Sequence, residues 1–134
     1  MIKYQPIDCP KLKSSHSTLI DFQWHRKAVE LKFTYPKDDQ RILQVNFDRA
    51  EIVRILDEFP LSTEEDKRHT TGLIVDHLAY LVEESPFYLQ QSTVWRDQSK
   101  DVRHFRFVTG AYCADVMSRS DPRFCVLDNL ESSL

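Results

Sequence analysis

Apolar side chains recur at every second residue over much of this chain, and this period limits the folds that it can adopt. From Val29 to Tyr35 every odd position is apolar, and the positions between them are charged or polar. Because successive side chains of a β-strand point to opposite faces, such alternation is typical of a strand with one buried face. The sequence therefore predicts a protein built mainly from antiparallel sheet, with one face apolar and the other polar.

The same period returns in several other parts of the chain. It covers residues 18–24 and 43–47, and the short polar break after residue 24 predicts a hairpin between the first of these segments and the strand that begins near residue 28. Pro36 opens a turn that leads into residues 43–47. Residues 124–127 form the last predicted strand.

A further hairpin is predicted around Gly110, because glycine readily takes the positive φ that tight turns require. If Thr109 and Gly110 are the two turn residues, His104 lies directly opposite Asp115, with Arg106 on the same face. Directly opposed residues have Cβ atoms roughly 4.5–5.5 Å apart. The expected result is a polar pair across two strands.

Helical signals are fewer. Ser85 and Pro86 are favourable at the N-cap and the first helical position, and they predict a helix over about 85–97. Residues 49–58 and 73–83 are apolar enough to form either buried strands or helices, and their pattern does not separate the two.

These elements predict an α+β fold, with an antiparallel, β-rich meander of about six or seven strands and one main helix (about 85–97) packed on one face. Residues 1–134 are expected to form a single globular domain, with irregular segments at 1–16 and 129–134. The predicted core consists of Phe22, Trp24, Val29, Leu31, Phe33, Leu43, Val45, Phe47, Leu56, Leu78, Tyr80, Val82, Leu89, Phe105, Phe107, Val116, Phe124 and Val126.

Composition excludes several functional classes. Lys and Arg total 18 against 21 Asp and Glu, and this net charge of -3 argues against a nucleic-acid partner. Two glycines are too few for a glycine-rich phosphate loop. The odd number of cysteines (Cys9, Cys113 and Cys125) indicates free thiols, and neither a secretory leader nor a membrane span is evident. The prediction is a cytoplasmic protein without a cofactor.

The ionisable residues suggest no catalytic or metal centre. The five histidines lack the local spacing of zinc ligands, so no metal site is predicted. A pair such as His104 and Asp115 is half of a general-base arrangement, but no nucleophile or oxyanion site accompanies it. The expected role of the pair is therefore structural.

Short acidic runs are the remaining functional signal. They suggest a surface that attracts a basic protein partner, because complementary charge speeds association. The predicted partner-binding residues are Glu64, Glu65, Asp66, Glu83 and Glu84.

Three stretches, at residues 45–58, 80–89 and 104–122, together resemble a loose family of small uncharacterised bacterial proteins. The resemblance covers about residues 42–127 and implies strands at 51–57 and 78–83, with a helix starting at Ser85. Some small proteins of this kind are similar to immunity proteins. The resemblance carries over no catalytic residue.

Three functions follow as hypotheses. The first is a non-catalytic cytoplasmic protein-binding module, of the kind represented by an immunity protein that inhibits a basic toxin. The second is a domain that binds a small molecule or forms a homodimer. The third is a small enzyme that uses His104 and Asp115 as an acid–base pair. No nucleic-acid or membrane partner is expected.

Overall fold

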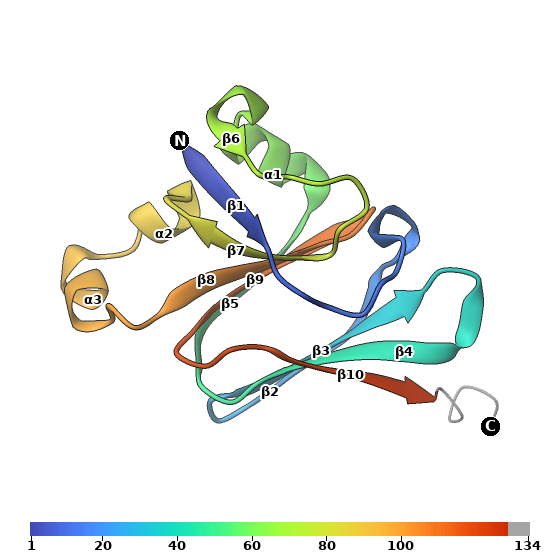
Figure 1. Cartoon of the computed structure of the whole chain (residues 1–134). Helices are drawn as coiled ribbons and strands as arrows, with labels where there is room; N and C mark the ends of the chain where they lie inside the picture. Colours follow the sequence, from blue (N-terminus) through green and yellow to red (C-terminus); the bar gives the residue numbers. More distant parts are fainter. Residues whose placement is uncertain (129–134) are drawn as a thin grey trace.

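The computed structural model describes residues 1–128, which form ten strands in two sheets (Figure 1). The smaller sheet has the order β10-β4-β3-β2, formed by Arg123–Asp128, Asp38–Phe47, Ala28–Tyr35 and Leu19–His25. The larger sheet has the order β5-β9-β8-β7-β1-β6, formed by Ala50–Asp57, Tyr112–Ser118, Arg103–Val108, Ala79–Glu83, Ile2–Pro6 and Thr70–Thr71. The predicted α+β class with antiparallel sheet is confirmed. The strand number is higher than predicted, and the parallel β1–β6 pair makes the larger sheet mixed.

The apolar faces of the two sheets pack against each other. Phe33 of β3 lies 5.8 Å from Phe107 of β8, and Phe47 of β4 lies 5.4 Å from Phe105, measured between ring centroids. These rings belong to one continuous cluster of buried residues from both sheets. Burying a side chain of this size stabilises a fold by about 1.5–3 kcal/mol. The alternation in the sequence thus marks the faces between the sheets.

The chain crosses between the two sheets at two neighbouring connections, from β4 to β5 and from β9 to β10. Only two residues, Asp48 and Arg49, separate β4 from β5, and the Oγ of Ser120 accepts hydrogen bonds from both of their backbone N–H groups. In the smaller sheet β4 pairs with β10, and in the larger sheet their neighbours along the chain, β5 and β9, pair with each other. This arrangement joins the sheets at a corner.

The helical prediction was only partly right. Ser85 caps a helix, since its Oγ accepts from the N–H of Tyr88, but this helix, α2 (Pro86–Leu89), has only four residues. A second N-cap, Ser92, starts α3 (Thr93–Gln98), so the expected single helix over 85–97 is two short ones. The longest helix in the described residues, α1 (Glu58–Glu64), was not predicted. Short 3₁₀ turns cover Ser14–His16 and Lys67–His69.

The two segments left open by their pattern contain strands. Most of 49–58 is β5, and the end of 73–83 is β7. The expectation of an irregular segment at 1–16 holds for residues 7–13 but is wrong for residues 2–6, because β1 lies inside the larger sheet between β7 and β6. Its apolar alternation spans only Ile2 and Tyr4, which is too short a pattern to recognise. The predicted irregular segment 129–134 lies outside the described residues.

Most of the predicted core is confirmed, and its errors lie mainly at the sheet edges. Leu56 and Phe124 are half-buried. The exposed members are Phe22, Trp24, Leu89 and Val126. Phe22 and Trp24 belong to β2 and Val126 to β10, and both are edge strands of the smaller sheet. Leu89 is the last residue of α2.

Candidate functional site

The β8–β9 hairpin brings His104 and Asp115 together in a register that differs from the predicted one. Arg106, not His104, lies directly opposite Asp115, and the last pair before the turn is Val108 with Cys113. The Oγ1 of Thr109 accepts from two backbone N–H groups within this longer turn. His104 reaches Asp115 diagonally instead, with 2.7 Å between Nε2 and Oδ1.

Asp115 is the centre of a buried network of charged side chains. Its carboxylate accepts from Nε of Arg106 at 2.6 Å, from His104, and from Nη2 of Arg54 on β5 at 2.8 Å. Asp115 and Arg106 are completely buried. Burial alone would raise the pKa of Asp115, but the hydrogen bond from His104 and the charge of Arg106 outweigh it and hold the pKa well below its usual range. The aspartate is therefore ionised inside the protein.

The other end of Arg106 binds Glu65 and Tyr4. Its Nη1 donates to Oε2 of Glu65 at 2.6 Å and to the hydroxyl of Tyr4 at 2.5 Å, and Tyr4 in turn donates to Glu65. Glu65 is the C-cap of α1 and is only 4% exposed. The prediction that Glu65 belongs to a partner-binding surface is therefore wrong. Its carboxylate joins α1 to the sheet.

Both ring nitrogens of His104 have partners. Nδ1 lies 2.8 Å from the Oγ of Ser85. Because Nε2 faces the ionised Asp115, it carries the proton, and Nδ1 accepts from the Ser85 hydroxyl. Burial outweighs the attraction of Asp115 and lowers the pKa of His104, so the ring is neutral at neutral pH.

Ser85, His104 and Asp115 thus form a hydrogen-bonded chain of the residue types that serve in nucleophilic catalysis. Ser85 is fully buried, His104 is 2% exposed, and the Ser85 oxygen also caps α2. A nucleophile must reach the reacting atom of its substrate. In this structure the chain of groups fixes α2 to the sheet, and the side chain of Ser85 is fully buried.

The other predicted acidic residues lie in two separate places. Glu64 on α1 is held by both terminal nitrogens of Arg54, and Asp66 pairs with Arg68 at 2.8 Å. Glu83 ends β7 and Glu84 follows it, and both are exposed. The Glu84 carboxylate lies 3.7 Å from the amino group of Met1. The sequence-predicted set is therefore not one surface.

Glu83, Glu84 and His104 line one pocket, and this pocket is the candidate site. We call this pocket, of about 220 Å³, the β7–α2 pocket. The remaining lining residues are Leu81, Val82, Tyr88, Val102 and Arg103. Arg103 pairs with Asp121, so its charge is already matched. The pocket offers apolar walls with two exposed carboxylates.

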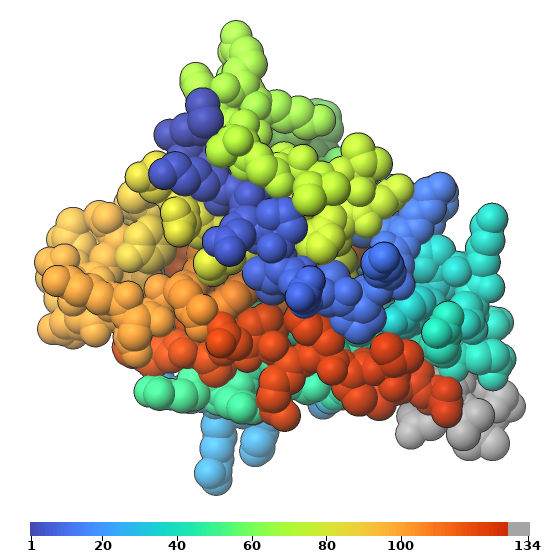
Figure 2. All heavy atoms as spheres, in the orientation of Figure 1, coloured from blue at the N-terminus to red at the C-terminus, as the bar shows by residue number. Residues whose placement is uncertain are grey.

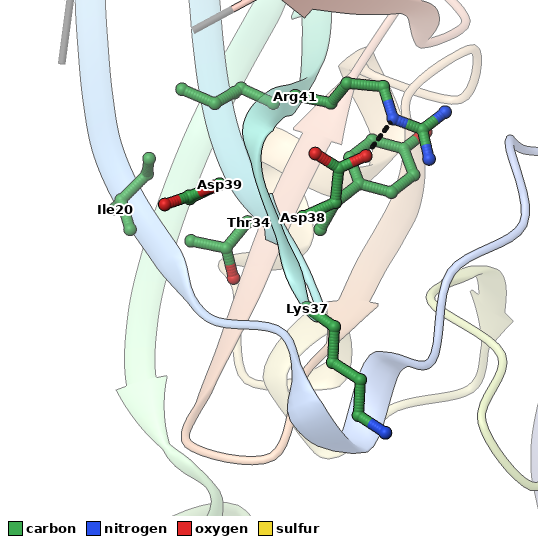
Figure 3. A pocket seen from close by; sticks show the side chains of 8 residues that line it. Ile20, Thr34, Lys37, Asp38, Asp39 and Arg41 are labelled. Atoms are coloured by element: carbon green, nitrogen blue, oxygen red, sulfur yellow. Dashed lines mark hydrogen bonds and ion pairs between the residues drawn. The ribbon is translucent and has the colours of Figure 1, made fainter. Parts of the chain in front are cut away.

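A larger hollow of about 440 Å³ lies at the β3–β4 turn (Figure 3). Two of its charged side chains engage each other, since Arg41 pairs with Asp38 at 2.6 Å, and the Arg41 guanidinium also lies 4.7 Å from the centre of the Tyr35 ring. None of the site residues that the sequence predicts lines this hollow.

No group of three or more His, Cys, Asp or Glu residues within residues 1–128 is arranged to hold a metal ion. Burial raises the pKa of Cys113 to about 12, so its thiol is protonated. No helix in this part of the chain is long and apolar enough to cross a bilayer.

No protein-family model matches this chain, and no curated protein or solved structure matches it either. The resemblance to small immunity-like bacterial proteins therefore stays a prediction.

Besides Glu65, which was assigned to a binding surface, sequence reasoning missed Tyr4, Arg54 and Ser85 as members of the buried network. One signal was present. Between Ala111 and Met117 only Asp115 is charged, and a nearly continuous apolar run is typical of a strand that is buried on both faces. A charge inside such a run requires a buried partner.

Proposed function

We propose that this protein is a non-catalytic protein-binding module whose partner presents basic side chains to the β7–α2 pocket. The observation that carries the proposal is the exposure of Glu83 and Glu84 at a pocket with apolar walls. A lysine or arginine packs its methylene stem against apolar surface and keeps its charged end near carboxylates. The pocket matches both parts of such a side chain.

The burial of Ser85, His104 and Asp115 supports a non-catalytic function. All three are at most 2% exposed, and the polar atoms of each are used within the fold. Their arrangement favours a structural role over the alternative of an acid–base enzyme. It also gives the pocket a rigid base, because His104 forms part of the lining.

The more specific proposal is an immunity protein that inhibits a basic toxin. It is supported by the net charge of -3 and by the exposed carboxylate of Glu83 at the pocket, which lies opposite Lys3 of β1 but forms no ion pair within residues 1–128. Charge complementarity of this kind mainly increases the association rate and selects against wrong partners.

Charge reversal tests the proposal. The protein and a Glu83→Lys/Glu84→Lys variant are used to capture proteins from the native host, followed by mass spectrometry. A matched control, Asp8→Lys/Asp128→Lys, changes the net charge equally at exposed positions outside the pocket. We expect one stoichiometric basic partner with the parent protein and the control, and its loss with the pocket variant. Equal capture by all three proteins would contradict the assignment of the pocket.

A further inference from the structure

Strand β2 presents two aromatic side chains on an open sheet edge. Phe22 lies opposite Leu31 and Trp24 opposite Val29, so both rings are on the face that β3 buries against the larger sheet. Yet Phe22 is 36% and Trp24 45% exposed. Among the described residues, β3 is the only strand that pairs with β2. In Figure 2 the side chains at the β2–β3 turn project clear of the rest of the molecule.

We propose that β2 pairs antiparallel with β2 of a second copy, about a two-fold axis at Gln23. The backbone of β2 supports this pairing. His25 and Ala28 close a two-residue turn, and such a closing pair exchanges both of its backbone hydrogen bonds. Because hydrogen-bonded and non-hydrogen-bonded pairs alternate, the backbone groups of Trp24 and Phe22 point to the free edge. They are the groups that a new strand would engage.

An axis at Gln23 places the side chains of residues 21–25 opposite suitable partners. Phe22 then faces Trp24 of the second copy on the aromatic side of the sheet. On the other side Asp21 faces His25 of the second copy, which opposes an acidic and a basic group. A two-fold interface repeats each of these contacts, so one short strand contributes twice.

Other registers fit less well. A shift of one residue opposes side chains from different faces of the sheet, because the period of a strand is two. An axis at Phe22 brings Ile20 into the pairing, and the ladder is irregular between Leu19 and Asp21. An axis at Asp21 opposes two aspartates, and an axis at Trp24 requires Arg26, which lies in the turn with a φ of 58°. Gln23 is the axis that keeps the regular part of β2 paired.

The composition of β2 also favours a strand partner. Exposed edges are usually protected by proline, by lysine or by a bulge. Residues 21–25 contain neither proline nor lysine, and the irregularity lies before them. This surface is on the smaller sheet, whereas the β7–α2 pocket is formed by the larger sheet and its helices. The proposal is therefore independent of the proposed function.

Disulfide cross-linking tests both the dimer and its register. In a Cys9→Ser/Cys125→Ser background, the remaining Cys113 is buried. We expect Gln23→Cys to form a covalent dimer under mild oxidation, because the two residues meet at the axis. Glu30→Cys is the control, because it lies on the same side of the neighbouring β3 but away from the free edge. Asp21→Cys is expected to cross-link with His25→Cys in a mixture, but not with itself.

Solution mass provides the second measurement. We expect sedimentation to show a concentration-dependent dimer, and Phe22→Lys/Trp24→Lys to give half that mass with unchanged circular dichroism. Leu89→Lys, at an apolar position on α2 that is at least as exposed, should leave the dimer intact. A monomer at every concentration would overturn the proposal. So would a dimer in which Gln23→Cys cross-links no faster than Glu30→Cys.

Discussion

Arg106 holds together the buried charged network on the larger sheet. It is fully buried and binds Asp115 at one end of its guanidinium and Glu65 at the other. Taking these charges out of water is costly, so the network need not make the fold more stable than an apolar core would. Its effect is to fix β8, β9 and α1 in one arrangement.

Removal of Arg106 is expected to destabilise the protein strongly. In Arg106→Ala two buried carboxylates lose their main cation, and we expect the free energy of unfolding to fall by about 3–5 kcal/mol. Arg68→Ala removes the ion pair between the exposed Arg68 and Asp66, and this loss should cost at most about 1 kcal/mol of unfolding free energy. Urea unfolding measures both. Similar losses in the two variants would show that the buried network is energetically unimportant.

His104 predicts a pH dependence of stability. Its pKa in the folded protein lies below the ordinary value of 6.5, because burial and the charge of Arg106 both oppose protonation of the ring. The nearby Asp115 favours protonation but does not outweigh the burial. Below pH 6.5 the unfolded chain therefore binds a proton that the folded chain does not, and stability falls as the pH falls. Above pH 6.5 this contribution is constant.

The measurement is the unfolding free energy between pH 7.5 and pH 5, a window above the ordinary pKa of the carboxylates. We expect the decrease to be smaller in His104→Gln, which cannot take up the proton. The same pH slope in the parent protein and in His104→Gln would contradict the assignment.

Among the elements, α2 is short and depends on its cap. The Ser85 hydroxyl accepts from the N–H of Tyr88 and donates to His104, so one oxygen serves both the helix and the sheet. The ring of Phe87 in α2 packs 5.7 Å from the His104 ring, measured between centroids. A helix of four residues is not stable alone, so these contacts determine whether it forms.

Ser85→Ala is expected to destabilise the protein more than Ser92→Ala, although both remove an N-cap. Loss of a cap costs about 1 kcal/mol, and Ser85→Ala also leaves the buried Nδ1 of His104 without a donor, which costs a further 1–3 kcal/mol or so. Denaturant unfolding compares the two variants, and hydrogen exchange at residues 86–89 locates the effect. Equal losses would indicate that His104 does not depend on Ser85.

Strands were predictable from this sequence where one face alone is apolar, as in β3 and β4. The helices were not, because Ser92 divides a pattern that otherwise continues, and because α1 contains Pro60 and few apolar residues. The His104–Asp115 pair was foreseen, since the two share a face, but not its burial. That burial depends on α1 and α2, which cover the second face of the sheet from distant parts of the chain.

For the whole molecule, the corner between the sheets has the largest consequence. The β4–β10 and β5–β9 pairs fix the two sheets relative to each other. The cluster of buried residues from both sheets, including the phenylalanine rings, fills the space between them. An open sheet edge at β2 and a pocket beside α2 then lie on different sheets. A self-association surface and a partner surface can therefore coexist without competition.

This separation is testable. If the dimer and the proposed partner use different surfaces, Phe22→Lys/Trp24→Lys should still capture the basic partner while remaining monomeric. A complex of lower mass but the same stoichiometry per chain is expected by light scattering. Loss of the partner in this variant would show that β2 contributes to binding.

The position of β1 has a consequence for how the chain acquires its structure. This strand begins at Ile2, whereas its neighbours in the sheet, β7 and β6, begin some seventy residues later, at Ala79 and Thr70. On a ribosome, residues 2–6 must wait unpaired until both neighbours have emerged. Topologies dominated by such distant pairings fold in milliseconds to seconds rather than microseconds. Ile2 and Tyr4 are therefore exposed to other nascent chains and to chaperones during that interval.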